Sequence, residues 1–101
     1  GFDGYAVDLR RGTATYYRPE GDVFEVSGIA PVHVEERWDA ATVKEAIREA
    51  QAQVPGYTYP GFCRKVAAAG CAGYLVSFPG RRVLYYGRTA DTHVEHFPGS
   101  P

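Results

Sequence analysis

The chain has 101 residues and a formal net charge of −1, and 45% of its residues are hydrophobic and 14% aromatic. This length and composition indicate one globular domain with a modest core and exclude a disordered chain. The nearly neutral charge gives no overall attraction to nucleic acid or to an anionic membrane, and no apolar run approaches the roughly 20 residues of a membrane span.

The first half is predicted to contain three strands and then a helix. Alternating apolar and aromatic residues predict strands at about Tyr5–Leu9 and Thr13–Arg18, with a third within Val23–Glu36. A helix is expected from Ala40 to about Gln53. Asp39 is its N-cap candidate, and the following Val-Pro-Gly sequence ends it.

The second half is predicted to be a helix followed by three strands. The helix spans Pro60–Ala69, with proline in its first turn and Gly70 placed to adopt the left-handed conformation that ends it. The strands are expected at Tyr74–Phe78, Val83–Tyr86 and Thr92–Phe97.

Similar residues recur in the two halves, in the same order. Gly1-Phe2-Asp3-Gly4-Tyr5 resembles Gly70-Cys71-Ala72-Gly73-Tyr74, and at the same offset Tyr16-Tyr17 meets Tyr85-Tyr86. His33-Val34-Glu35 matches His93-Val94-Glu95 if the first copy carries nine extra residues. The second copy enters Gly70 from a helix, so we expect an equivalent helix ahead of Gly1 in the parent protein. We expect its absence here to leave an apolar patch exposed.

These elements predict a single α+β domain built of two repeats. Residues 1–38 form the first meander, 39–56 the connecting helix, and 57–101 the second helix with the second meander. Two pseudo-symmetric three-stranded meanders should make a mainly antiparallel sheet with the helices packed on one face.

Paired arginines and paired tyrosines recur in the two predicted hairpins. A guanidinium group beside a tyrosine ring could bind phosphate while a base stacks, or it could simply pack on the ring in solvent. The candidate ligand-binding residues are Arg10, Arg11, Tyr17, Arg18, Arg81, Arg82, Tyr86 and Arg88.

A second group of residues could carry enzyme chemistry. His93 and Glu95 are two apart in a strand and share a face, as a general base or a metal site would need, whereas His96 points the other way. A third metal ligand is not apparent, so no metal or cofactor is expected. Cys63 could be a nucleophile, or an inert member of its helix's apolar stripe.

The second half also resembles a known family. The sequences Tyr59-Pro60-x-Phe62-Cys63 and Gly80-Arg81-Arg82-x-x-Tyr85-Tyr86-Gly87-Arg88 are similar to the bacterial domain of unknown function numbered 1398, sometimes labelled phage envelope protein. The similarity is densest over residues 57–98. It implies a small cytoplasmic α+β protein, and it supplies no catalytic residues. Two cysteines without a disulfide framework also suit a reducing cytosol.

Three functional classes remain open from the sequence. The leading hypothesis is a non-enzymatic interaction or ligand-binding module, because no catalytic constellation is complete. A small enzyme using His93 and Glu95, with or without Cys63, is the second. A nucleic-acid or anion binder acting through the arginine hairpins is the third. A protein partner or a second copy of the chain would suit the first class.

Overall fold

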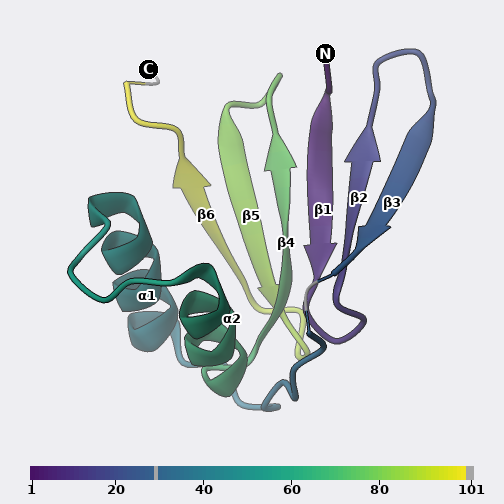
Figure 1. The fold of residues 1–101 in the computed structure, drawn as a ribbon. Coiled ribbons are helices and arrows are strands. Elements are labelled where there is room, and N and C mark those ends of the chain that lie inside the picture. The colour runs from purple at the N-terminus through teal and green to yellow at the C-terminus, as the bar shows by residue number, and fades with distance from the viewer. Residues whose placement is uncertain (29, 100–101) are drawn as a thin grey trace.

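A computed structural model describes residues 1–28 and 30–99. It shows an α+β fold, which confirms the fold class expected from the sequence (Figure 1). In chain order the elements are β1 (Gly4–Asp8), β2 (Thr13–Tyr17), β3 (Val23–Ser27), α1 (Ala40–Ala52), α2 (Tyr59–Ala68), β4 (Cys71–Ser77), β5 (Arg82–Gly87) and β6 (Thr92–His96).

The strands form one six-stranded antiparallel sheet in the order β3-β2-β1-β4-β5-β6. Each half of the sheet is a meander of three consecutive strands. The two meanders meet at the centre, where β1 pairs with β4. The first strand of each meander is therefore internal, and β3 and β6 are the edge strands.

The two meanders have the same strand register. Thr13 pairs with Ser27 in the first, and Arg82 pairs with His96 in the second, so positions 13 and 27 become 82 and 96. Where the meanders meet, Tyr5 pairs with Val76 and Val7 with Tyr74, and the same offset exchanges these two pairs. A pseudo-twofold axis therefore passes through the centre of the sheet.

The predicted nine-residue insertion in the first copy is wrong. The register places β3, Val23–Ser27, opposite β2 just as β6 lies opposite β5, with no extra residues between the strands. His33-Val34-Glu35 lies after β3, outside any strand, and is not the counterpart of His93-Val94-Glu95. The shared His-Val-Glu sequence is a similarity of letters only.

Both helices begin where the sequence places their caps. The Asp39 carboxylate accepts a hydrogen bond from the Thr42 backbone N–H at 3.2 Å, and the Thr58 hydroxyl accepts one from the Gly61 N–H at 3.1 Å. After α2, Gly70 has φ +91°, the left-handed conformation expected there. Neither helix in the described part of the chain has the length and apolar character needed to cross a bilayer.

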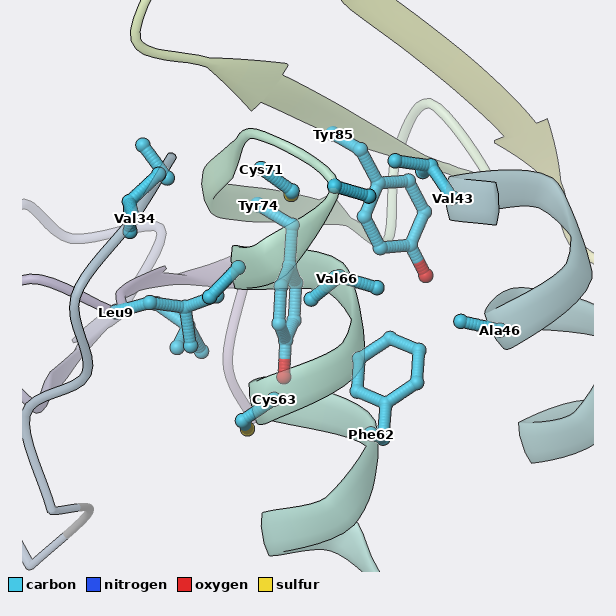
Figure 2. Packing of buried hydrophobic residues seen from close by; sticks show 14 of the residues in the cluster. Leu9, Val34, Val43, Ala46, Phe62, Cys63, Val66, Cys71, Tyr74 and Tyr85 are labelled. Atoms are coloured by element: carbon cyan, nitrogen blue, oxygen red, sulfur yellow. The ribbon is translucent and has the colours of Figure 1, made fainter. Parts of the chain in front are cut away.

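The main core lies between the helices and the sheet. Buried residues of α1 and α2 pack together with Tyr74, Val76 and Tyr85, which share one face of the sheet by register. Figure 2 shows Tyr74 and Tyr85 pointing from the strands toward the helices. Val43 and Val66 are fully buried, and each contributes about 1.5–3 kcal/mol from its removal from water.

The helices are held to each other by Lys65. Its ammonium group donates to Glu45 at 2.7 Å and to Glu49 at 3.0 Å, and so links α2 to α1. The three side chains are partly exposed, so the pairs orient the helices more than they stabilise the fold. Both helices lie beside the β4–β6 half of the sheet, and the β1–β3 half carries none (Figure 1).

The segment between β3 and α1 crosses beneath one end of the sheet. Backbone hydrogen bonds run from Val32 to Leu9, from Glu35 to Ala67 and from Asp39 to Ala69, at 2.8–3.0 Å. Val34 is buried in this segment and belongs to the core. The crossing therefore ties the end of β1 to the end of α2.

Two equivalent glycines allow β1 and β4 to approach at the centre of the sheet. A Cβ atom on Gly4 would lie well inside van der Waals contact of the Val76 carbonyl oxygen, and one on Gly73 would do the same to the Val7 carbonyl oxygen. Both clashes are with backbone, which cannot rotate away. These glycines are therefore required by packing rather than by a turn.

We expect Gly73→Ala to lower the free energy of unfolding by roughly 1–3 kcal/mol, because the added methyl group forces apart the central strand pair. Urea unfolding followed by circular dichroism measures the change. Gly1→Ala is the matched control, since a Cβ atom there meets nothing within 4 Å. Equal stability of the two variants would show that the central pair accommodates the methyl group.

Candidate functional site: an aromatic face without a helix

The second meander carries a row of three rings across its strands, on the face that meets the helices. Tyr74, Tyr85 and His93 pair with one another in register along β4, β5 and β6. Their ring centroids are 5.4 Å and 6.4 Å apart. Tyr74 and Tyr85 are each only 8% exposed, because the helices cover this row.

The first meander carries the equivalent row at the same register positions. Tyr5, Tyr16 and Phe24 pair along β1, β2 and β3, with ring centroids 5.2 Å and 5.5 Å apart. No helix of the described chain covers this row. Tyr5 and Tyr16 are accordingly only half-buried, and Phe24 is 43% exposed.

Further rings extend this row. Phe2 lies 5.3 Å from Tyr16 and 5.5 Å from Phe24, and Phe78 lies 6.3 Å from both Tyr5 and Phe97. Ring contacts therefore continue from the edge strand β3 to the residue after β6. We call these six residues the aromatic face: Phe2, Tyr5, Tyr16, Phe24, Phe78 and Phe97.

Two arginines border the aromatic face. The Arg18 guanidinium lies 5.7 Å from the centre of the Phe2 ring, and that of Arg81 lies 5.8 Å from the centre of the Phe97 ring. Arg18 is also 3.7 Å from Asp22. The face is thus an apolar surface with a cationic rim, which is the usual composition of a binding surface.

The two arginine–tyrosine hairpins predicted from the sequence lie at opposite ends of the sheet. Arg10 and Arg11 follow β1, whereas Arg81 and Arg82 lie in the turn that follows β4. Because β1 and β4 run antiparallel, these turns point in opposite directions. The structure therefore does not bring the two hairpins together.

The tyrosines predicted to act with these arginines lie on the other face of the sheet. Tyr17 pairs with Gly4 and Tyr86 with Gly73, one position along from the rings of the two rows. The doubled tyrosines thus divide between the two faces, as the sequence analysis expected.

Several of these arginines bind groups of the same chain. Arg88 donates to the Val34 carbonyl at 3.0 Å, and Arg82 donates to the Gly80 carbonyl at 3.0 Å. Arg11 lies 3.5 Å from the Glu25 carboxylate. These contacts give the arginines a structural role at strand ends.

His93 and Glu95 do lie together, as their spacing predicts. The His93 Nε2 atom is 2.6 Å from Glu95 Oε2, and both side chains are partly buried. His33 and Glu35, 3.6 Å apart, are exposed. The described residues include no group of three or more metal-binding side chains.

Cys63 lies in different surroundings from His93. It is buried on α2 beside Tyr59 and Tyr74, whose hydroxyl groups are 2.6 Å apart. His93 stacks on Tyr85, and its strand lies two positions from β4, about 10 Å across the sheet. Burial raises the pKa of the Cys63 thiol, which disfavours the thiolate that a nucleophile requires.

The sequence analysis did not identify the aromatic face as a site. Its rings come from five separate places in the chain, and they become neighbours only once the strand register is known. A signal was nevertheless present. Tyr5 and Tyr16 are the counterparts of Tyr74 and Tyr85 in the repeat, so covered rings in one half imply equivalent rings in the other.

The buried Cys63 thiol should react slowly. In a Cys71→Ala variant we expect Cys63 to react with Ellman's reagent at pH 8 at least about tenfold more slowly in the folded protein than in urea, because burial disfavours its thiolate. Absorbance at fixed reagent concentration gives both rates. A folded-state rate equal to or above the unfolded rate would support the nucleophile hypothesis instead.

Cys71 should make the protein less stable in alkali. Burial raises the pKa of its thiol from 9.0 to about 11, so the folded state favours the protonated form. That stabilisation is present below pH 9 and is lost as the pH rises to about 11. Relative to Cys71→Ala, the wild type should lose about 2–3 kcal/mol over this window. Urea unfolding at several pH values tests this, and parallel stability curves would contradict it.

Comparison with known proteins gives a family but no activity. Residues 1–95 match the family described as protein of unknown function DUF1398, which includes both meanders and both helices. No curated protein matches the chain. The match covers nearly the whole sequence, so the chain belongs to the DUF1398 family of proteins of unknown function.

Proposed function

We propose that the protein is a non-enzymatic interaction module that binds an apolar partner on its aromatic face. One observation carries this proposal: two equivalent rows of rings lie on the same sheet, and only one of them is covered. Tyr74 and Tyr85 are each 8% exposed, whereas Phe24, at the edge of the uncovered row, is 43% exposed. The difference lies in what packs on the rings.

The aromatic face has the physical properties of a binding surface. Aromatic side chains bury about 150–250 Å² each and supply much of the energy of protein interfaces. Their contacts with one another reduce the conformational freedom that binding would otherwise remove. Arg18 and Arg81 remain close to the rings and provide a polar border. A contiguous exposed apolar surface of this kind is typical of an interaction site.

The geometry supports this function better than the two alternatives. The arginine hairpins point to opposite ends of the sheet, so a single strand of nucleic acid would not follow both. His93 and Glu95 pair with each other, while Cys63 lies beside Tyr59 and Tyr74. Only the aromatic face brings several of the sequence's unusual residues into one continuous surface.

The dye ANS, which fluoresces when it binds an apolar surface, provides a direct test. We expect the folded protein to enhance ANS fluorescence, and the double variant Phe2→Ser with Phe24→Ser to lower this enhancement at least about threefold, because two exposed rings are lost. Circular dichroism checks that the variant is folded.

The matched control is Val23→Ser. Val23 is 57% exposed and adjoins Phe24 on the same edge strand, but its side chain lies on the opposite face. Its substitution should leave dye binding unchanged. If Val23→Ser lowers the fluorescence as much as the double variant does, or if neither has an effect, the aromatic face is not the binding surface.

A further inference from the structure

We propose that the partner on the aromatic face is an amphipathic α-helix of another protein, seated over β1 and β2 as α2 is seated over the second meander. This inference rests on the proposed function and names the kind of partner. It follows from the pseudo-twofold axis, from a hollow beside α2 and from the continuity of the core.

The symmetry argument concerns what already covers the second meander. The apolar stripe of α2, which includes Phe62, Cys63 and Val66, packs with Tyr74 and Tyr85 in the core. The pseudo-twofold axis carries these two tyrosines onto Tyr16 and Tyr5. A surface with the same rings at the same register can receive the same kind of helix.

A hollow lies where such a helix would adjoin α2. It has a volume of about 430 Å³ and is lined mainly by apolar groups. Tyr59, Pro60 and Cys63 form its α2 wall, and Val32 belongs to the opposite wall. Tyr59 is 36% exposed although its hydroxyl is bonded to Tyr74. A helix beside α2 would cover this ring.

The uncovered rings also continue an interface that already exists. Tyr5 and Tyr16 pack against the same core cluster that contains the buried stripe of α2. A helix docked over them would therefore extend the present core rather than create a separate one. This continuity favours a helix over an extended peptide at the sheet edge, which would pair with β3 and leave Tyr5 uncovered.

The geometry also defines the chemistry of the helix. It needs an apolar stripe like that of α2, with an aromatic residue near one end and small aliphatic residues at i+3 and i+4 spacing along it. Arg64 borders the hollow, so an acidic residue on the helix flank would meet a cation there.

The α2 sequence itself supplies the probe. A peptide of residues Tyr57–Ala69 carries the required stripe, with Cys63→Ala to prevent oxidation. A hydrocarbon staple joining positions 64 and 68, which α2 exposes to solvent, holds it helical. We expect saturable 1:1 binding in an NMR titration, with the ring signals of Tyr5 and Tyr16 shifting most.

Matched variants locate the binding. Phe24→Ser should weaken the affinity for the peptide at least about tenfold, and Val23→Ser, on the opposite face, should change it less than about twofold. A peptide carrying Val66→Asp should not bind, because the charge falls in its apolar stripe. If Phe24→Ser perturbs folding, Val26→Ser replaces it, since Val26 is 45% exposed on the same strand and face.

The outcomes separate this inference from the proposed function. ANS binding that depends on Phe24, without peptide binding, overturns the helix and leaves the interaction module standing. Failure of both probes overturns both. Self-association that Phe24→Ser abolishes and the peptide does not displace, measured by light scattering, would make a second copy of this chain the occupant and overturn the partner helix.

Discussion

The antiparallel pairing of β1 with β4 is the interaction on which the rest of the structure depends. It joins two three-stranded meanders, each too small to bury an apolar face alone, into one sheet of six strands. The pairing requires glycine at two equivalent positions, Gly4 and Gly73, because the strand backbones approach closely there. It also fixes the pseudo-twofold axis, and with it the equivalence of the two rows of rings.

The symmetry of the sheet is not matched by its helices. Both helices lie over the second meander, where Val43 and Val66 are fully buried, and the first meander presents its rings without cover. The molecule is thus a symmetric scaffold with an asymmetric load. This asymmetry distinguishes the aromatic face from other exposed apolar residues on the sheet, such as Val23 and Leu75, which belong to the opposite, solvent-facing side.

Much of the fold follows from local sequence signals. Alternating apolar residues located all six strands, and the Asp39 cap and Gly70 marked helix boundaries, because these features depend on neighbours in the chain. Features that depend on register could not be predicted. Matching His-Val-Glu sequences suggested an insertion, yet packing aligns β3 with β6 directly. The arginine hairpins resemble each other in sequence but point apart, because the strands that carry them are antiparallel.

The central position of the first strand has a consequence for folding. β1 is made first, but its partner β4 begins at Cys71, so the pairing that closes the sheet spans most of the chain. Contacts of such long sequence separation slow folding and must wait until the second half has left the ribosome. Until then the nascent chain displays an unpaired strand edge next to exposed rings. A chaperone that shields apolar segments during synthesis would therefore act chiefly on the first 28 residues.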